Sequence, residues 1–563
     1  MMPETLRAPA YEFQNGAKKL DLSALTSAGA TSRVDLKNRG SELRSTRSQL
    51  GAFFSPYWLA RKLVRQMLNL AGEPIESYAD RKFLEPAAGL GVFALAYIDE
   101  VLERARCAGV HSREFFVAVV ESVHCIEIDK NMYTIMCSTV LQHLTDNYAE
   151  YMQPYTALPH SMNTNAIVRS SNASWKLTLA GDLCGKCDVR YGFDFVATNP
   201  PFNLIKPNAK RGTTAEELTA FSDWKSAEKE AKGLLGTQGV QNWYRIFLGR
   251  IMQSFLKSAG SFAIIVPATL LADATASDLR KELLAFYELG EVSVFRENDP
   301  IFPGVSQSIV AFTAKDTALN HAHGDIRVTT DVVELVFSRE DLVKRGGIIP
   351  QTRITPIFAA LIESAAPNLM DTDYIQNVRG EVDVTKFSSA IVDLAADTIG
   401  YPPLIRGANI KRFSSADARQ VFVGNLSSLG PKQMLSKKRR LVSQQISQHA
   451  QVRRLNFMIV PAGVLVANSC NVLAINGPSG HVTEEALLAY MNSAPVNERF
   501  KWTSSNNHVS NGELGRIPLP HAHDVRWKQL NELGLELCNR VTETDEARVD
   551  IIVLSMHSDP CCG

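Results

Sequence analysis

Four consecutive residues, Asn199 to Phe202, combine side chains that could do chemistry on a planar amino group. They follow an apolar run, residues 193–198, that predicts a buried strand. Pro200 and Pro201 fix a rigid turn and remove two backbone N–H donors, so the turn presents hydrogen-bond acceptors. The amide oxygen of Asn199 and the carbonyl of Pro200 could accept both amino hydrogens and so prepare the nitrogen to attack a sulfonium methyl group. The ring of Phe202 could stack on an extruded base, which contributes about 1 to 3 kcal/mol. The simpler alternative is a proline turn that ends a strand.

A glycine turn lies upstream, between a short apolar run at 82–84 and a helical pattern at 92–105. Glycines let the backbone approach a ligand at the carboxyl edge of a strand. The turn lacks the third glycine of the dinucleotide fingerprint and has no phosphate cradle, which disfavours NAD and ATP. Its candidate cofactor-binding residues are Glu85, Pro86, Ala87, Gly89 and Gly91, and Asn199 is expected to contact the cofactor as well as the target.

Two acids end later strand candidates. Glu127 follows residues 123–126 and could accept from the ribose hydroxyls of a nucleoside cofactor. Asp182, with Leu183 after it, could accept from the adenine amino group of that cofactor. Each acid taken alone could instead be a helix N-cap. The stretch from Glu85 to Glu127 also requires a longer crossover than usual.

Strand and helix patterns alternate around these residues. We expect strands at 82–84, at either 115–120 or 123–128, and at 176–180, 193–198, 261–266, 291–295 and 308–313. Helical patterns fill 59–70, 92–105, 130–144, 243–258 and 274–287, with Ser55 and Pro56 in place to cap the first. The alternation predicts an α/β fold with a Rossmann-like doubly wound sheet, whose ligands bind at the carboxyl ends of the strands.

The domain organisation follows from where this alternation begins and ends. Residues 1–45 are expected to form an N-terminal arm, and residues 46–330 the domain that carries the candidate site. Residues 331–525 are expected to form a second domain of mixed α+β type. A closing helix at 529–541 and a tail complete the chain at 526–563.

The bulk composition is that of a globular protein, with 563 residues, 45% hydrophobic residues and a net charge of zero. The segment 401–460 departs from this balance, because it holds eleven basic residues and one acid. Such a surplus suits phosphate contacts, although a solvated basic face is the alternative. No signal peptide or membrane span is expected, and scattered cysteines suit a reducing compartment, which together indicate the cytoplasm. No metal site is expected.

The ordered set of motifs resembles the gamma class of DNA adenine-N6 methyltransferases, the TaqI-like type II enzymes, over residues 48–315 and more loosely over 400–520. The resemblance implies S-adenosylmethionine as cofactor and N6 of a flipped adenine as target. It assigns residues 51–56, with Ser55 and Pro56, to a cofactor clamp. It further implies that Phe302 packs on the base opposite Phe202, although Phe302 could equally be a core aromatic.

In the second domain, residues 401–413 resemble a recurrent stretch of target-recognition domains, and 492–493 and 516–520 resemble their usual ends. The resemblance therefore implies contacts with double-stranded DNA. The candidate DNA-binding residues are Arg406, Lys411, Arg412, Lys437, Lys438, Arg439 and Arg440. Residues 203–240 form an insertion that matches nothing in the family.

The expected function is site-specific methylation of adenine in DNA, as the modification component of a restriction-modification system whose endonuclease, where there is one, is a separate chain. Two alternatives share the fold: a methyltransferase for ribosomal RNA and one for a protein glutamine. A third is a catalytically idle DNA-binding or specificity subunit. A fused restriction enzyme would need a nuclease module, for which the first 45 residues are too few.

Overall fold

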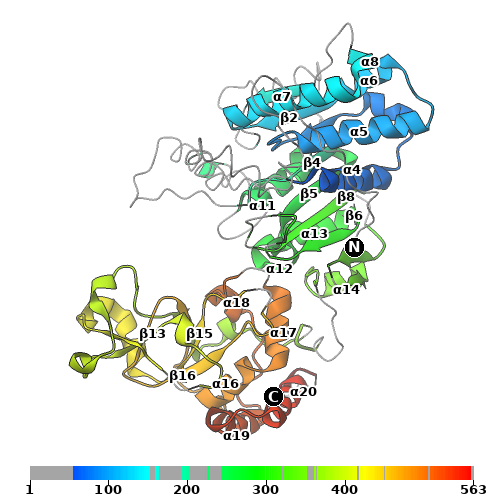
Figure 1. Ribbon diagram of the computed structural model, residues 1–563. Coiled ribbons are helices and arrows are strands. Elements are labelled where there is room, and N and C mark those ends of the chain that lie inside the picture. The colour runs from blue at the N-terminus through cyan, green and yellow to red at the C-terminus, as the bar shows by residue number, and fades with distance from the viewer. Residues whose placement is uncertain are drawn as a thin grey trace. The chain divides into compact units, whose positions relative to one another are not determined.

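The computed structural model describes most of the chain. Its described residues are 55–152, 159–163, 166, 192–202, 222, 225–226, 242–297, 299–302, 305, 307–318, 322–331, 333–351, 360–362, 364–414, 417–448, 451–504 and 507–558. The chain divides into two compact units, Met1–Gln351 and Thr352–Gly563, and each is described by itself. Figure 1 gives the element labels that are used below.

The first unit is built on one sheet with ten described strands. These are β1 (Phe83–Glu85), β2 (Val123–Glu127), β3 (His160–Asn163), β4 (Phe193–Thr198), β5 (Leu256–Pro267), β6 (Tyr287–Leu289), β7 (Val292–Phe295), β8 (Ile309–Asp316), β9 (Ile326–Thr329) and β10 (Glu334–Phe337). Their order is β10-β9-β7-β8-β5-β4-β1-β2-β3, with β6 also paired to β8. Strands β3, β2, β1, β4 and β5 are mutually parallel, whereas β8 runs antiparallel to β5 and β7. The predicted doubly wound α/β sheet is confirmed.

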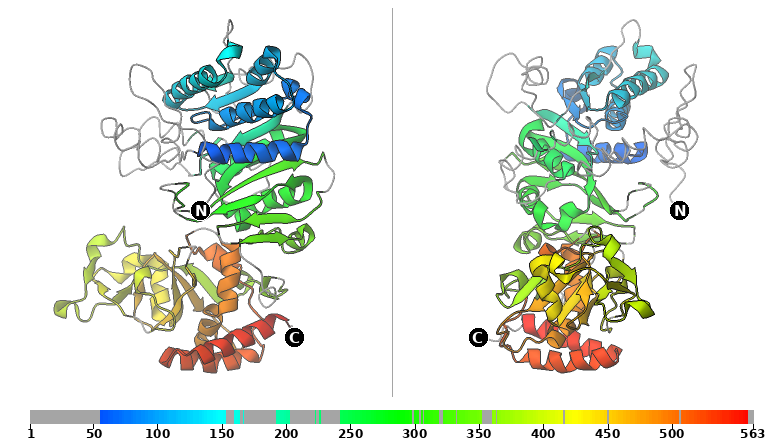
Figure 2. Two further views of the ribbon diagram at one scale, coloured as in Figure 1. Left: turned by 45° about the vertical axis from the view of Figure 1, so that its right-hand side comes forward. Right: turned by 90° about the vertical axis from the view of Figure 1, so that its left-hand side faces the viewer.

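Helices connect and cover these strands. They are α4 (Tyr57–Ala71), η2 (Ile75–Asp80), α5 (Val92–Cys107), α6 (Arg113–Glu121), α7 (Lys130–Asn147), α8 (Ala149–Met152), α11 (Trp243–Arg250), η3 (Ile251–Phe255), α12 (Thr269–Ala272), η4 (Ala274–Ala276), α13 (Ser277–Phe286) and α14 (Arg339–Lys344). Helices α4 and α5 lie side by side, and α4 also packs on β5 and β8 (Figures 1 and 2).

The chain order of the strands creates a switch point between β1 and β4. From β1 the chain proceeds through β2 to β3 on one side, and from β4 to β5 on the other. Such a reversal opens a crevice at the carboxyl ends of the two central strands. The aromatic core holds those strands together, because Tyr97 of α5 stacks on Phe83 of β1 at 4.4 Å and lies 5.8 Å from Phe195 of β4. The candidate site therefore begins where β1 and β4 end.

Two local expectations in the first unit are corrected, and one open alternative is settled. Of the two strand candidates, residues 115–120 belong to helix α6 and the strand is Val123–Glu127; short apolar runs fit either element until their packing is known. The extra helix α6 accounts for the long stretch between Glu85 and Glu127. The expected helix 243–258 ends earlier, because α11 passes through one π turn into β5 at Leu256. Ser55 does not cap α4, whose N-cap is Pro56 without a side-chain hydrogen bond.

The hairpin of β9 and β10 extends the sheet of the first unit. This unit ends at Gln351, whereas the expected domain ended at residue 330. The second unit contains two four-stranded sheets, β11-β18-β15-β16 and β12-β14-β13-β17. Their strands are β11 (Ile375–Arg379), β12 (Ile391–Asp393), β13 (Pro403–Ile405), β14 (Gln420–Phe422), β15 (Arg440–Gln444), β16 (Phe457–Val460), β17 (Leu465–Val466) and β18 (Cys470–Ile475).

Helices complete the second unit. The α-helices are α16 (Glu484–Met491), α17 (Ala494–Thr503), α18 (Asn511–Gly515), α19 (Arg526–Asn539) and α20 (Glu543–Ser558), and the 3-10 turns are η5 (Leu369–Asp371), η6 (Ser388–Ala390), η7 (Ala396–Thr398), η8 (Gly407–Asn409) and η9 (Leu426–Lys437). The predicted mixed α+β type is confirmed. The expected closing helix is α19, but it is followed by α20, which packs against it (Figure 2). The sequence prediction missed α20 and assigned its residues to a tail.

Candidate functional site

Asn199 follows the last residue of β4, at the carboxyl end of the strand beside β1. Its side-chain nitrogen donates a hydrogen bond to Ser55 Oγ at 3.0 Å, across the 144 residues that separate them in sequence. Pro200 is buried, whereas Asn199 and Pro201 are half-buried. The structure thus holds the predicted acceptor turn at the switch point and fixes the amide of Asn199 from the segment before α4.

The glycine turn lies at the carboxyl end of β1, one strand from Asn199. Gly89 and Gly91 both have positive φ, at 54° and 75°, which a glycine adopts without the penalty that a side chain imposes. Gly91 is the left-handed N-cap of α5, and a Cβ there would lie 3.1 Å from Met136 and from Val140 of α7. Ala88 N donates to Ile126 O of β2 at 2.9 Å, so the turn is held against the second strand.

Glu127 ends β2, and its carboxylate contacts the glycine turn directly. Gly89 N donates to Glu127 Oε2 at 2.7 Å, and Asp129 N donates to Glu127 Oε1 at 2.9 Å. A carboxylate has about four lone-pair positions, so further donors such as ribose hydroxyls remain compatible with these two contacts. Burial raises the pKa of Glu127, and the two backbone donors oppose that shift. The glycine turn and the proposed ribose acid therefore form one continuous edge.

Glu85 has a different environment from Glu127. It is only 2% exposed, and its two oxygens accept from Phe93 N at 3.2 Å and Ala94 N at 2.8 Å in the first turn of α5. A carboxylate at a helix N-terminus interacts favourably with the helix dipole. Burial raises the pKa of Glu85 well above that of an ordinary glutamate. Its described contacts therefore orient α5 and the glycine turn. Pro86 is buried beside it and Ala87 is half-buried.

The two candidate stacking aromatics are buried in the structure. Phe202 is 3% exposed and belongs to the core of the first unit. Phe302 is 2% exposed and packs edge to face on Phe295, with ring centroids 5.4 Å apart. In this arrangement Phe302 contacts its neighbours as a core aromatic does, and a base could stack on either ring only after the ring became accessible.

A buried polar network anchors the start of α4, and sequence reasoning missed it. The Tyr57 hydroxyl donates to Asp99 Oδ2 of α5. Asp99 Oδ1 also accepts from the Tyr148 hydroxyl at 2.7 Å and contacts His143 Nε2 at 2.8 Å. These hydrogen bonds lower the pKa of Asp99 although burial opposes them. The sequence signal was a pair of acids, Asp99 and Glu100, directly after the apolar first half of α5.

Several predicted site residues lie outside the described residues, so their placement is left open. They are Asp182, Leu183, residues 51–54 of the clamp, the arm at 1–45, the strand candidate 176–180 and nearly all of the insertion at 203–240.

The basic residues of the second unit fall into two groups. Lys411, Lys437, Lys438 and Arg439 are exposed, as phosphate contacts require. Arg440 is fully buried and pairs with Glu381, its Nη2 lying 2.6 Å from Glu381 Oε1. The prediction that Arg440 contacts DNA is therefore wrong, because its guanidinium is enclosed and satisfied within the unit.

Arg412 is half-buried, pairs with Glu546 and lies over the ring of Phe413 at 5.3 Å. Burial lowers its pKa to about 10. Asn492 is buried as well and exchanges two hydrogen bonds with the backbone of Phe457, so the 492–493 motif supports the packing of the unit.

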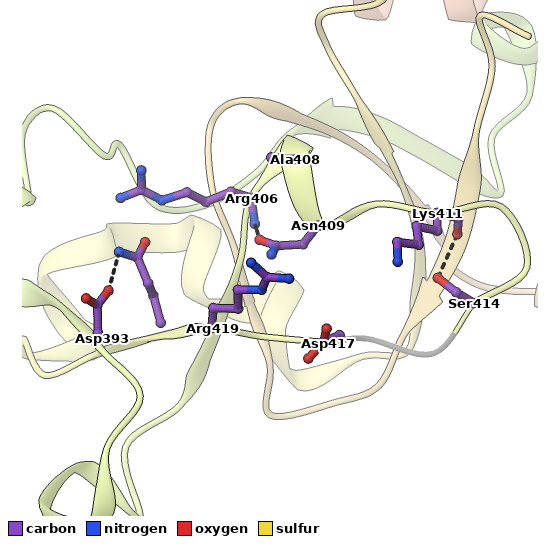
Figure 3. Close-up of a pocket in the computed structure, with 9 residues that line it drawn as sticks. Asp393, Arg406, Ala408, Asn409, Lys411, Ser414, Asp417 and Arg419 are labelled. Carbon is purple, nitrogen blue, oxygen red and sulfur yellow. Dashed lines mark hydrogen bonds between the residues drawn. The ribbon is translucent and has the colours of Figure 1, made fainter.

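A polar pocket of about 550 Å³ lies beside the half-buried Arg406 in the second unit. Figure 3 shows Asn409, Lys411 and Arg419 around the same space, with Asn409 Oδ1 accepting from Arg406 N at 2.9 Å. Its lining comprises Asp393, Arg406, Ala408, Asn409, Lys411, Ser414, Asp417, Arg419 and Gln420. Arg, Asn and Gln are side-chain types that read base edges, and the list of DNA-binding candidates lacked Asn409, Arg419 and Gln420.

Within the part of the chain that the structure describes, no cluster of three or more His, Cys, Asp or Glu side chains is arranged to hold a metal ion. None of the described helices has the length and hydropathy that crossing a membrane requires.

The sheet has parallel central strands, with a glycine turn after β1, an acid at the end of β2 and an Asn-Pro-Pro-Phe turn after β4. This arrangement defines the class, which is a Rossmann-like methyltransferase fold. The comparisons agree. Residues 121–302 match the model of the Eco57I restriction-modification methylase family. No protein of curated function matches the chain.

Solved structures with the same fold come from restriction-modification enzymes. The cryo-electron microscopy structure of a DrdV–DNA complex has a TM-score of 0.55 and 12% identity, covering 92% of this chain and 59% of that one. The Type IIL restriction-modification enzyme MmeI in complex with DNA has a TM-score of 0.52 and 13% identity, covering 95% of this chain and 76% of that one. The ATP-dependent Type ISP restriction-modification enzyme LlaBIII bound to DNA has a TM-score of 0.54 and 12% identity, covering 91% of this chain and 42% of that one.

Proposed function

We propose that the protein is a site-specific DNA methyltransferase of the gamma, TaqI-like class, which transfers a methyl group from S-adenosylmethionine to N6 of an adenine flipped out of duplex DNA. The single observation that carries the proposal is the position of Asn199 at the carboxyl end of β4, directly beside the glycine turn that follows β1. The family match over residues 121–302 supports it. A cytoplasmic location and a separately encoded endonuclease belong to the same proposal.

The residues at this edge fit the proposed cofactor chemically. Glu127 offers a carboxylate for ribose hydroxyls, and its contact with Gly89 N places that carboxylate against the backbone of the glycine turn. Gly89 and Gly91 carry no side chain, so the backbone is open to a ligand at these two positions. When bound, S-adenosylmethionine supplies an electrophilic methyl group on a sulfonium. Asp182, whose expected partner is the adenine of the cofactor, belongs to the same proposal.

In the target site, Asn199 and Pro200 accept hydrogen bonds from the two hydrogens of the adenine amino group. These contacts draw the nitrogen lone pair out of conjugation with the ring and hold it in a fixed position, which is where most of the catalysis arises. Phe202, and on the other side Phe302, stack on the extruded base once their rings become accessible. Pro201 keeps the turn rigid, since its ring fixes φ.

The second unit is proposed to hold the duplex. Phosphate contacts come from exposed Lys437, Lys438 and Arg439, and base contacts from the polar pocket that Arg406 and Lys411 line. A protein glutamine as substrate would need neither phosphate nor base contacts.

The test offers tritiated S-adenosylmethionine to the wild-type protein with duplex DNA, RNA and protein in separate reactions. Label is expected in DNA alone, and sequencing of modified bases should locate it on adenine in one sequence context. Label only in RNA or protein would refute the proposal.

The Asn199→Ala protein is expected to lose methylation while largely keeping its affinity for DNA, measured by titration calorimetry. Asn147→Ala is the matched control, because Asn147 Nδ2 donates only locally, to His143 O of the same helix at 2.8 Å. Methylation by the Asn199→Ala protein at the wild-type rate would remove Asn199 from the mechanism.

A further inference from the structure

Ser55 contacts the candidate catalytic asparagine rather than capping the helix that follows it. It is 4% exposed, and its Oγ accepts from Asn199 Nδ2 at 3.0 Å. The next residue, Pro56, is the N-cap of α4 and makes no side-chain capping bond. The hydroxyl of Ser55 is thus directed to the amide of Asn199 and not to the backbone of α4.

The amide of Asn199 needs such a partner. Its backbone is set by β4 on one side and by Pro200 on the other, but these constraints leave the two side-chain torsions open. A carbonyl oxygen accepts well only from donors near its own plane, so an amide that rotates accepts poorly. One hydrogen bond to the amide nitrogen fixes the plane and turns the nitrogen, rather than the oxygen, toward Ser55.

Ser55 itself is held by the buried network at the start of α4. Tyr57, two residues later, donates to Asp99, which lies on α5 and also accepts from Tyr148 at 2.7 Å. Asp99 contacts His143 Nε2 of α7 at 2.8 Å. Helices α5 and α7, with Tyr148 directly after α7, therefore fix the position of the α4 N-terminus. The packing of α4 on β5 and β8 joins it to the sheet that carries Asn199.

We infer that Ser55 is a positioning residue for catalysis, which orients the amide of Asn199 toward the target amino group and is kept in place by the Tyr57–Asp99 hydrogen bond. This inference rests on the proposed function, in which the oxygen of Asn199 is the acceptor. The inferred role differs from the cofactor-clamp role that the family resemblance assigns to residues 51–56. A positioning residue affects the rate of methyl transfer, whereas a clamp residue affects the affinity for the cofactor.

The experiment separates those two roles in the full-length protein. For Ser55→Ala we expect kcat, measured in single turnovers, to fall about 10- to 100-fold. The Kd of S-adenosylmethionine, measured by calorimetry, is expected to stay within about twofold of wild type, because in the inferred role Ser55 makes no contact with the cofactor. Ser55→Thr, which keeps the hydroxyl, is expected to restore most of the rate.

Ser122→Ala is the matched control for the loss of a buried hydroxyl. Ser122 is 9% exposed, and its Oγ donates to Val119 O at 2.7 Å within the same unit. Its kcat should match that of wild type at a similar cost in Tm. Tyr57→Phe serves as the second variant if Ser55→Ala fails to fold, and a fall in kcat with unchanged cofactor Kd is expected there too.

A wild-type kcat in Ser55→Ala or, where that variant does not fold, in Tyr57→Phe would overturn the inference. If the Kd for the cofactor is raised at the same time, Ser55 belongs to the cofactor clamp instead. If the wild-type protein methylates RNA or protein instead of DNA, the proposed substrate fails, but the same variants measured on that substrate still test Ser55.

Discussion

Replacing Arg440 by methionine should destabilise the second unit without removing a DNA contact. The guanidinium donates to Glu381 Oε1 at 2.6 Å, to Val464 O at 2.9 Å and to Lys438 O at 3.0 Å, and neither charged side chain is exposed. The R440M protein loses these bonds and leaves Glu381 buried, with the Val466 N–H donating to it at 3.1 Å. Removing one partner of a buried pair costs about 3 to 5 kcal/mol.

That loss should be visible as a change in melting temperature. For a unit of this size, about 2 to 4 °C are lost per kcal/mol, so the transition of the second unit should fall by about 6 to 20 °C. Scanning calorimetry of the full chain measures the shift, and hydrogen exchange read by mass spectrometry assigns it to residues 352–563. The adjacent Arg439→Met is the control, because Arg439 is 49% exposed and its pair with Glu485 should contribute at most about 1 kcal/mol.

The same variant makes a prediction about pH. Burial already raises the pKa of Glu381, and Arg440 opposes that rise, so R440M raises it further. In the folded variant Glu381 stays protonated above the pKa of about 4.3 that it has in the unfolded chain. The stability of the variant therefore falls as pH rises from about 4.3 through the raised pKa of the folded state. The deficit relative to wild type should be larger at pH 8 than at pH 5. Equal and small shifts for R440M and R439M, or a loss of DNA affinity in R440M without a loss of stability, would refute this account.

Three further predictions concern the proposed site and its partner. Gly91→Ala should lower the stability of the first unit by about 1 to 2 kcal/mol or more, because φ is 75° and the new Cβ would lie 3.1 Å from side chains of α7. A Tm equal to that of wild type would contradict this prediction. Glu127→Gln should raise the cofactor Kd by about tenfold or more in calorimetry. In wild type the pKa of Glu127 is raised, so cofactor affinity should begin to fall at a higher pH than it would with an ordinary glutamate. A cofactor affinity that does not change with pH argues against the ribose role. The double variant K437A/K438A should reduce the slope of log affinity against log salt by about 1.8, at roughly 0.9 per phosphate contact, whereas an unchanged slope places the duplex elsewhere.

The sheet could be predicted from sequence because its central strands are buried on both faces. Residues 193–198 are apolar apart from Asp194 and Thr198, all six are buried, and the strand lies where the pattern indicated. Residues 115–120 show the limit of the method. Their apolar run suits a strand as well as a helix, and the choice depends on packing against neighbours that the local pattern does not contain.

The site was predictable to the extent that it depends on residue type at a strand end. Asn199 and Gly89 follow β4 and β1, and Glu127 ends β2. Parallel strands bring their carboxyl ends to one edge of the sheet. The hydrogen bond between Ser55 and Asn199 was not predictable, because the two residues are 144 positions apart in sequence. A serine before a proline is also typical of a helix N-terminus, which suggested a capping role instead. The Asp99 network was not predictable for the same reason, because its hydrogen-bond partners are 42 to 49 residues away in sequence.

The basic segment of the second unit shows why a count of charges does not define a binding surface. Arg439 and Arg440 are adjacent, yet one is exposed and the other enclosed, because Arg440 begins β15, whose first four residues are all buried, whereas Arg439 precedes that strand. Arg454 is also fully buried, where it donates to Ser504. Composition counts all eleven cations alike, whereas only those that reach solvent can neutralise phosphates. Under the proposed function, the residues that hold DNA are therefore to be sought at Lys437, Lys438 and Arg439 and around the pocket of Arg406, Lys411 and Arg419.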